Sequence, residues 1–257
     1  MGIINATPDS FFSGSRQPGL EASLHKAEQM LKEGATILDI GGQSTRPGCS
    51  TVGASEELKR VLPVVETIHL HFPEAILSID TYLAKVAYET VEAGVSIVND
   101  ISAGYMDEAM LTTVAALQVP YVCMHMKGTP QTMQQQATYK DVTREIIDFF
   151  IHRIEDCRWA GIHDIIIDPG FGFSKTITHN FQLLKDLSLF GILQKPLLLG
   201  ISRKSTIYRT LEITAEEALN GTTVLNTIGL LNGAQILRVH DVKEAVEAIR
   251  LIQAYKE

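Results

Sequence analysis

The sequence predicts an α/β protein folded as a single (β/α)8 TIM barrel over residues 1–257. Short runs of β-branched and other apolar residues alternate along the chain with segments of helical periodicity, an order typical of parallel βα units. The length of 257 residues suits one such barrel, which commonly needs about 250 residues, and no linker or low-complexity tract marks a domain boundary. The apolar runs also end in polar residues, as expected where an active site forms at the carboxyl ends of barrel strands.

Eight segments have the length and apolar character of strands buried on both faces. The run HDIIID at 163–168 shows the pattern: isoleucines lead to Asp168, and PGFGF then turns the chain through glycines directly after the carboxylate. Carboxyl ends of parallel barrel strands meet on one rim, so these polar ends indicate one site. The expected strands are 2–5, 36–40, 75–80, 96–99, 119–124, 163–168, 196–201 and 235–239. Their polar ends carry Asp39, Asp80, Asn99, Asp100, Asp168, Arg203, Lys204, Arg238 and His240.

The segments between these strands have the spacing of amphipathic helices. Near 20–33, Leu24, Ala27 and Met30 fall on one helical face, and Gly34 follows as a stop signal. The segment near 140–160 behaves in the same way, with a glycine directly beyond its end. The expected helices lie near 20–33, 54–71, 83–93, 107–117, 140–160, 179–190, 214–232 and 241–255.

Composition excludes several classes of protein. With 30 acidic and 22 basic residues the formal charge is −8, which argues against a general nucleic-acid surface but still allows a local basic cluster for a small anion. The three cysteines are widely spaced, so a disulfide framework or zinc site is not expected and a reducing cytoplasm is the simpler location. No apolar stretch approaches the roughly 20 residues that span a bilayer, and the opening MGIINATPDS lacks the pattern of a signal peptide.

Motifs at the strand ends carry a resemblance to a known family. They are NATPDSFF at 5–12, DIGGQSTRPG at 39–48, SIDT at 78–81, NDI at 99–101, MHMKGTP at 124–130, DPGFGF at 168–173, GISRKS at 200–205 and RVHDV at 238–242. In this order they resemble the dihydropteroate synthases. The resemblance implies a transferase of folate biosynthesis that condenses p-aminobenzoate with (7,8-dihydropterin-6-yl)methyl diphosphate, giving 7,8-dihydropteroate and pyrophosphate. It also implies a Mg²⁺ cofactor, a cytoplasmic homodimer and a sulfonamide target.

The acidic strand ends suit a pterin site. A flat heterocycle rich in N–H donors needs acceptors held in a fixed plane, which carboxylates on separate strands can supply. The resemblance implies that Asp168 and Asn99 bind the ring, and that Asp80, Asp168 and Lys204 take part in catalysis. The plainer interpretations are a helix cap for Asp168, turns for Asp80 and Asn99, and a solvated lysine for Lys204. The implied pterin-binding residues are Asp80, Asn99, Ile101, Met124, Asp168, Gly200 and Lys204.

The last expected strand suggests an anion site. Arg238 and His240 are two residues apart, so their side chains point to the same face, and arginine presents a planar fork of donors to phosphate oxygens. The resemblance adds Asn5 and Arg46 to this diphosphate site and implies that Asn5 binds the Mg²⁺ ion. The alternative is a structural salt bridge between Arg238 and Asp241.

Two long connections, 6–19 and 41–53, are rich in Gly, Ser, Thr and Pro and are expected to be functional loops over the barrel mouth. The alternative is that they are merely disordered. Met124, His125 and Met126 are interpreted mainly as barrel filling. The resemblance implies that p-aminobenzoate is bound by Thr45, Arg46, Pro47, Phe173, Lys204 and Ser205.

The expected mechanism has no covalent intermediate, since the diphosphate departs while cations neutralise its charge and the neutral arylamine then attacks. No Ser-His-Asp or Cys-His pattern stands out at the rim, which agrees with this chemistry. The chain departs from the family's usual residues at Ser13, Gly14 and Ser15, at Gln43 in place of glutamate, and at Ser174 in place of glycine. None of these positions is assigned to substrate binding.

Two other functions remain open at this point. A pterin-binding methyltransferase module shares the barrel and the pterin contacts, but it has no need of the Arg238 and His240 clamp or of the SRK motif. A non-catalytic paralogue that binds only pterin or a partner chain would be expected to lack Asp168, Lys204 or Arg238, all of which are present.

Overall fold

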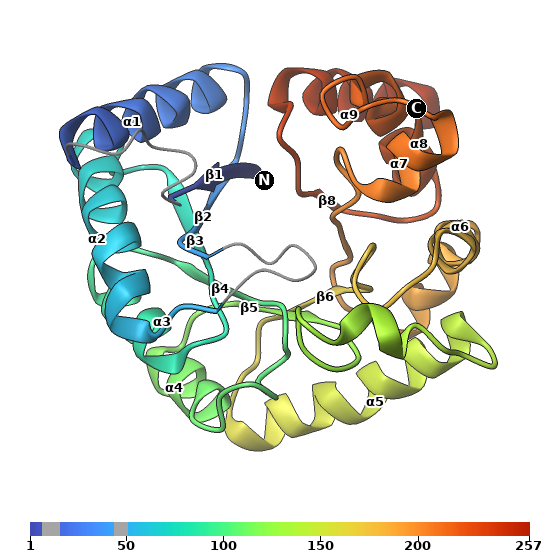
Figure 1. Ribbon diagram of the computed structural model, residues 1–257, viewed down its shortest axis with the longest axis horizontal. Helices are drawn as coiled ribbons and strands as arrows, with labels where there is room; N and C mark the ends of the chain where they lie inside the picture. Colours follow the sequence, from blue (N-terminus) through green and yellow to red (C-terminus); the bar gives the residue numbers. More distant parts are fainter. Residues whose placement is uncertain (7–15, 44–50) are drawn as a thin grey trace.

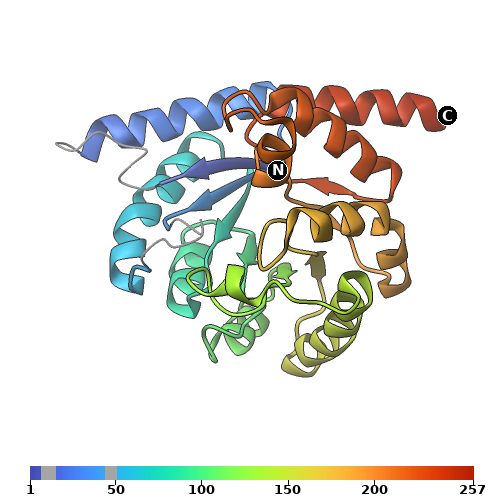
Figure 2. The same ribbon diagram turned by 45° about the vertical axis from the view of Figure 1, so that its right-hand side comes forward.

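The computed structural model describes residues 1–6, 16–43 and 51–257, and strands and helices alternate along them (Figure 1). The strands lie at the centre and the helices surround them, as the turned view also shows (Figure 2). None of the helices in these ranges is long and apolar enough to cross a membrane. The strands are β1 (Gly2–Asn5), β2 (Ile37–Gly41), β3 (Ile76–Asp80), β4 (Ile97–Asp100), β5 (Tyr121–Met124), β6 (Ile165–Asp168), β7 (Leu198–Leu199) and β8 (Ile236–Leu237).

The parallel strands close into a barrel, as predicted. Strands β1 to β6 form one parallel sheet in chain order, and β7 pairs with β8. Two single bridges join these parts, one between Ile167 and Leu197 and one between Gly2 and Val239. The second is strengthened by a 2.9 Å hydrogen bond from the Ile3 N–H to the Val239 carbonyl. Strands β7 and β8 are therefore shorter than the predicted 196–201 and 235–239, but both are in place.

Most helices agree with the sequence prediction, and α2 has the predicted bounds. α5 begins where Asp141 caps the Arg144 N–H and ends at Gly161, whose φ of 102° requires a glycine. α4 begins three residues later than predicted because the Asp107 carboxylate accepts from the N–H groups of Ala84 and Ala109 and holds a turn. The described helices are α1 (Arg16–Lys32), α2 (Ala54–His71), α3 (Ala84–Glu92), α4 (Met110–Leu117), α5 (Val142–Ala160), α6 (Ile177–Lys185), α7 (Ser205–Leu211), α8 (Leu219–Leu231) and α9 (Val242–Lys256), with 3-10 helices η2 (Met133–Gln136) and η3 (Leu187–Leu193).

Three helical predictions are corrected. The helix predicted at 179–190 ends at Lys185 and continues as the 3-10 helix η3. The helix predicted at 214–232 begins only at Leu219, and α7 was not predicted. α7 has seven residues, and its Thr206 and Ile207 are β-branched, so its sequence carries little helical signal.

Apolar residues fill the barrel at its amino end. One buried cluster inside the strands contains Ile97, Val122 and Leu198, with partly buried isoleucines of β2, β6 and β8 packed against it. The main core lies between the strands and the surrounding helices and includes large side chains such as Phe150 and Phe190. This apolar floor leaves the carboxyl ends of the strands for polar residues.

Candidate active site

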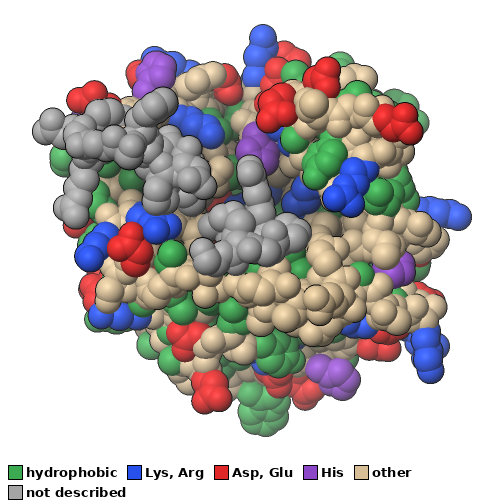
Figure 3. Space-filling view, viewed as in Figure 1, with side chains coloured by type: hydrophobic (Ala, Val, Ile, Leu, Met, Phe, Trp, Pro, Cys, Tyr) green, Lys and Arg blue, Asp and Glu red, His purple; other side chains and the backbone are tan. Residues whose placement is uncertain are grey.

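The register of the strands aligns the polar residues at their carboxyl ends. Asn5 pairs with Gly41, Gly41 with Asp80, and Asp80 with Asn99 across β1 to β4. Gly41 lies directly beside Asp80 in this row, since a Cβ on Gly41 would be in ordinary contact with the Asp80 Cβ at 3.5 Å. Figure 3 is a space-filling view from the same side as Figure 1. It shows a hollow near the centre of this face, with basic and histidine side chains at its edge.

Arg238 from β8 crosses the barrel to two carboxylates. Its Nε donates to Asp39 Oδ2 and its Nη2 to Asp80 Oδ2, both at 2.6 Å. Asp39 is fully buried and also accepts from Ser78 Oγ at 2.6 Å and from Asn99 Nδ2 at 3.1 Å. The sequence placed Asp39 at a strand end but assigned it no role. In the structure it holds Asn99 and Arg238 together.

The ionisation of this cluster follows from burial and pairing. Burial, together with the nearby Asp39 carboxylate, raises the pKa of Asp80 to about 6 against the charge of Arg238. Burial by itself would lower the pKa of Arg238, but the carboxylates of Asp39 and Asp80 reverse that effect and raise it. The guanidinium therefore stays charged, and Asp80 can gain a proton in mildly acidic solution.

Asp168 and Lys204 flank Gly200. A Cβ on Gly200 would lie 3.7 Å from Asp168 Oδ2 and 3.8 Å from Lys204 Nζ, so the glycine leaves space between them. Asp168 is buried, and its Oδ1 accepts from the Gly170 N–H at 2.7 Å. Lys204 Nζ donates to the Phe171 carbonyl at 2.5 Å and lies 4.8 Å from the centre of the Phe173 ring.

These two groups have opposite charges and opposite pKa shifts. Burial raises the pKa of Asp168, and the charge of Lys204 opposes the rise. Burial lowers the pKa of Lys204 to about 8, and the Asp168 carboxylate opposes the fall. Each therefore favours the charged form of the other across the space beside Gly200.

An apolar wall stands beside these polar groups. Tyr82, Ile101 and Met124 form a buried cluster separate from the main core, with Met126 and Phe173 packed against it. Ile101 and Met124 were implied as pterin-binding residues, whereas Tyr82 was missed because it follows the motif that drew attention to Asp80. This wall offers a flat heterocycle an apolar surface next to acceptors.

A hydrogen-bonded network connects the wall to α2. The Tyr82 hydroxyl donates to Gln43 Oε1 at 2.9 Å, and Gln43 Nε2 donates to the fully buried carboxylate of Glu57. Gln43 Oε1 also faces the Val52 N–H at 3.4 Å, so it ties the two described ends of the β2–α2 connection. Burial raises the pKa of Glu57 to about 7, although its hydrogen bonds favour the carboxylate.

His240 and Asp241 have partners other than Arg238. His240 Nδ1 lies 3.0 Å from Ser202 Oγ, and burial, helped by the charge of Arg238, lowers its pKa to about 4. The imidazole is therefore neutral at pH 7. Asp241 accepts from both Nε and Nη2 of Arg203 at 2.8 Å, so the alternative salt bridge between Arg238 and Asp241 is not formed.

Two of the remaining predicted site residues stand at the ends of elements, and the others lie outside the described ranges. Asn5 is exposed at the end of β1, and Ser205 begins α7. Thr45, Arg46 and Pro47 lie outside the described residues, as do Ser13, Gly14 and Ser15. In the described ranges no cluster of three His, Cys, Asp or Glu side chains could hold a metal.

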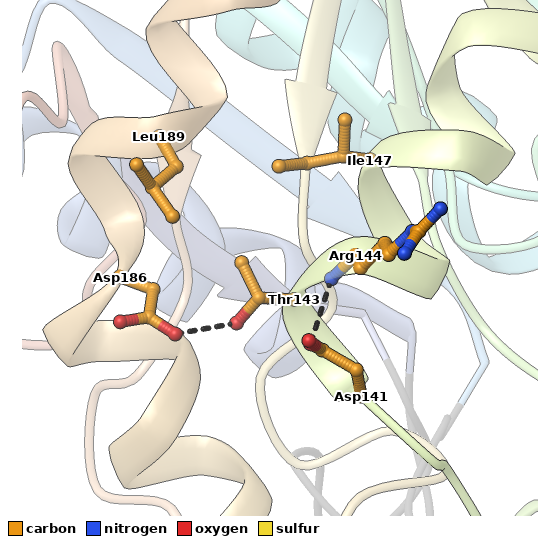
Figure 4. Close-up of a pocket in the computed structure, with 6 residues that line it drawn as sticks. All are labelled: Asp141, Thr143, Arg144, Ile147, Asp186 and Leu189. Atoms are coloured by element: carbon orange, nitrogen blue, oxygen red, sulfur yellow. Dashed lines mark hydrogen bonds between the residues drawn. The ribbon is translucent and has the colours of Figure 1, made fainter.

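A second depression lies on the outer wall, away from these residues. Its volume is about 190 Å³, and Figure 4 shows that it is formed by α5 and η3 with Asp186. Thr143 Oγ1 donates to Asp186 Oδ2 at 2.8 Å, and Asp141 caps α5. The polar groups that line it thus serve packing and capping, and none of the predicted site residues contributes. The lining residues are Asp141, Thr143, Arg144, Ile147, Asp186 and Leu189.

The chain is similar to known proteins of one family. A family described as "Pterin binding enzyme" matches residues 1–240. The chain is 44% identical to dihydropteroate synthase of Escherichia coli strain K12 over 256 residues, which cover 99% of this chain and 90% of that protein. A structure of Yersinia pestis dihydropteroate synthase with a sulfonamide drug has a TM-score of 0.94 at 43% identity, covering 100% of this chain and 93% of that one. Xanthomonas albilineans dihydropteroate synthase with 4-aminobenzoic acid has a TM-score of 0.93 at 39% identity, covering 100% and 92%.

Proposed function

The chain belongs to the dihydropteroate synthases, a family of pterin-binding transferases of folate biosynthesis, and on this premise we propose how its barrel mouth carries out the reaction. The enzyme condenses p-aminobenzoate with (7,8-dihydropterin-6-yl)methyl diphosphate to give 7,8-dihydropteroate and pyrophosphate. The observation that carries the assignment of residues is the convergence of Asp168, Lys204, Asp80, Asn99 and Arg238 from five different strand ends.

The pterin ring occupies the space beside Gly200. Asp168 accepts hydrogen bonds from the ring N–H groups. The charge of Lys204 favours its ionised form, and among the described residues only its Oδ1 accepts a hydrogen bond, from the Gly170 N–H. Asn99, oriented by Asp39, offers an amide to the same ring. The apolar wall of Tyr82, Ile101 and Met124 packs on its face.

The diphosphate lies toward Arg238 and His240. Within the described residues the two guanidinium bonds use Nε and Nη2, which leaves Nη1 for a phosphate oxygen. The neutral His240 contributes a hydrogen bond and no charge. Asn5, and Arg46 outside the described residues, complete this site. Mg²⁺ keeps several waters and prefers phosphate oxygens, so a single exposed Asn5 oxygen fits an ion carried mainly by the diphosphate, where it would neutralise negative charge.

The reaction proceeds by loss of the diphosphate and attack of the arylamine. The bond between the pterin methylene carbon and the diphosphate oxygen breaks, and both electrons leave with the oxygen toward Arg238. The carboxylates of Asp80 and Asp168 stabilise the positive charge that develops on the pterin. The p-aminobenzoate nitrogen then forms the new C–N bond with its lone pair and releases one proton to solvent. Phe173, Lys204 and Ser205, with Thr45, Arg46 and Pro47, form the amine site.

Location and assembly are proposed on separate grounds. The two cysteines in the described residues, Cys123 and Cys157, are free and buried, which supports a reducing cytoplasm. Val224, Ile228 and Leu231 form an exposed apolar stripe on α8, with exposed fractions of 49%, 37% and 48%, which supports a homodimer interface.

Calorimetric titrations test the assignment of residues. Asp168→Asn should lose affinity for the pterin by about 1 to 3 kcal/mol for each mismatched hydrogen bond, because the amide offers donors where acceptors are needed.

Arg238→Ala should weaken the binding of pyrophosphate and of the pterin diphosphate far more than the binding of the free hydroxymethyl pterin. Unchanged pterin affinity in a folded Asp168→Asn, or an equal loss for all ligands in Arg238→Ala, would refute the respective role.

A further inference from the structure

A buried lysine lies behind the substrate carboxylate. Lys175 is 3% exposed and follows the loop that begins at Asp168. Its Nζ lies 2.9 Å from the Phe173 carbonyl, 3.1 Å from His125 Nδ1 and 3.4 Å from the His125 carbonyl. The two carbonyls are acceptors, and His125 Nδ1 is a third when the imidazole proton lies on Nε2, so each of the three protons of an ammonium group has a partner. No step of the proposed mechanism uses Lys175 or His125.

The imidazole beside this amine must be neutral. Burial lowers the pKa of His125 well below its usual value, and the charges of Lys175 and Lys127 lower it further. Burial also lowers the pKa of Lys175 well below its usual value; the Asp168 carboxylate opposes this fall, and the charges of Lys204 and Lys127 add to it. An amine is ordinarily the much stronger base, and two carbonyl oxygens also face Nζ, so we place the proton on the amine, and His125 Nδ1 then accepts from it. The remaining proton of His125 is then on Nε2.

The loop after β6 is folded around this ammonium. The His125 N–H donates to the Asp168 carbonyl at 3.0 Å, which ties the end of β5 to the end of β6. Gly170, whose N–H holds the Asp168 side chain, has no room for a Cβ, which would stand 2.1 Å from the His125 carbonyl and 3.3 Å from Lys175 Nζ. Lys204 binds the Phe171 carbonyl while Lys175 binds that of Phe173. Two lysines therefore anchor alternate carbonyls of one short loop.

We propose that Lys175 is a positioning residue for the reaction: its buried ammonium fixes the loop that presents Asp168 and Phe173, and its charge favours the ionised Asp168 carboxylate. The charged groups that act on Asp168 are then Lys204 from the β7 loop, Arg238 from β8 and Lys175 from its own loop. His125 holds the ammonium in place from β5. This inference rests on the proposed role of Asp168 as the pterin acceptor.

Lys175→Met tests the role of the charge, with Lys140→Met at an exposed lysine as the matched control. As pH falls, the affinity for pterin measured by calorimetry should begin to decline at a higher pH in Lys175→Met than in the wild type. Without the nearby charge, Asp168 gains its proton more easily. Each unit of displacement corresponds to about a tenfold loss of affinity on the acidic side. Lys140→Met should match the wild type. An equal loss of affinity at every pH in Lys175→Met would show a merely structural role and would overturn the proposal.

His125 provides a second test if Lys175→Met fails to fold. His125→Asn keeps an acceptor near the place of Nδ1 and should bind pterin as the wild type does, whereas His125→Leu should show the acidic loss. Nitrogen NMR of the wild type should find His125 neutral, with its proton on Nε2, at acidic pH where an exposed histidine is already protonated. An ordinary histidine titration, or equal behaviour of the two variants, would overturn the proposal.

Carbon NMR of the Asp168 carboxyl in the free enzyme tests the effect of Lys175 independently of the proposed role of Asp168 in pterin binding. If Asp168→Asn leaves pterin affinity unchanged, the proposed role of Asp168 fails, yet a raised Asp168 pKa in Lys175→Met would still support the effect of Lys175 on that carboxylate. If Asp168→Asn loses affinity while the Asp168 titration is the same in Lys175→Met and wild type, only the inference about Lys175 fails.

Discussion

Three of the six non-glycine residues with left-handed backbone in the described ranges lie in loops at the carboxyl ends of strands. Ala103, Ser174 and Arg203 have φ of 52°, 50° and 53°, and they follow β4, β6 and β7 respectively. Such conformations cost of order 1 to 3 kcal/mol each and persist only where neighbouring contacts impose them. At Ser174 the contacts are visible: its hydroxyl accepts from the Lys127 N–H at 2.9 Å and donates to the Phe173 carbonyl at 2.7 Å. These hydrogen bonds offset the backbone strain of a serine at a position where the family usually has glycine.

Ser174→Gly should therefore lower the free energy of unfolding. Glycine relieves a left-handed strain of about 1 kcal/mol, but the partly buried Lys127 N–H then lacks its acceptor, which costs about 1 to 3 kcal/mol. Ser174→Ala keeps the strain and loses the same bonds. Urea unfolding should rank stability as wild type, then Ser174→Gly, then Ser174→Ala. A Ser174→Gly variant more stable than the wild type would contradict this account.

Glu57 should make stability depend on pH. Its pKa is about 7 in the folded enzyme and near 4.5 when exposed, so the native state holds a proton that the unfolded chain releases between these values. The free energy of unfolding should fall as pH rises from about 4.5 to about 7. Glu57→Gln is neutral throughout, so its stability relative to wild type should rise by roughly 1 to 3 kcal/mol over this range. Thermal unfolding at several pH values measures the difference, and Glu56→Gln on the exposed side of the same turn should show no such rise.

At the scale of elements, Arg203 explains where α8 begins. Its Nη1 donates to the carbonyls of Ala215 and Glu216 at 3.0 and 2.5 Å, so the chain before α8 bends around the guanidinium instead of extending the helix. The same side chain forms the two bonds to Asp241, and the backbone N–H of Arg203 donates to Thr222 Oγ1. One arginine thereby joins the loops after β7 and β8 to the first turns of α8. The sequence prediction of a helix from 214 followed apolar spacing and had no means of including this contact.

Arg203→Ala should loosen that junction. Loss of the bidentate pair and of the two carbonyl contacts should reduce the free energy of unfolding by about 1 to 3 kcal/mol, since both partners are partly exposed. Pyrophosphate binding should also weaken, because Arg203 lies between Ser202 and Lys204 in the chain. Chemical unfolding and calorimetry measure the two effects. Arg209→Ala, at an exposed arginine of α7, should change neither, and a similar loss in both variants would contradict the assignment.

At the scale of the whole molecule, the sequence predicts the barrel well and its polar connections poorly. Strand ends such as Asp168 stand out because a carboxylate after a run of isoleucines has few structural uses. The bond from Arg238 to Asp39 joins residues 199 positions apart, and no local pattern encodes such a partner. Lys175 and His125 are likewise 50 positions apart, and each alone resembles a solvated or core residue. Short-range signals thus locate the rim, whereas long-range ion pairs require the folded chain.

Assembly can be tested on α8. If Val224, Ile228 and Leu231 pack against a second copy, Ile228→Asp should place an unpaired charge in an apolar interface and shift the enzyme toward monomer. Size-exclusion chromatography with light scattering measures the mass in solution. Leu70→Asp, at an exposed apolar residue of α2, is the matched control and should leave the mass unchanged. A wild type that is already monomeric at high concentration would contradict the proposed homodimer.

The barrel closes between its last and first strands through very few backbone bonds, and Arg238 reaches across that closure from β8 to β2 and β3. A diphosphate held by Arg238 on one side and Asn5 of β1 on the other would join the same two edges from outside. The bound substrate would then act as a removable crosslink of the protein, and turnover would alternately fasten and release the ring of strands. The amide protons of Ile3 and Val239, which form the closing bonds, would exchange with solvent at a rate that reports whether the anion site is filled.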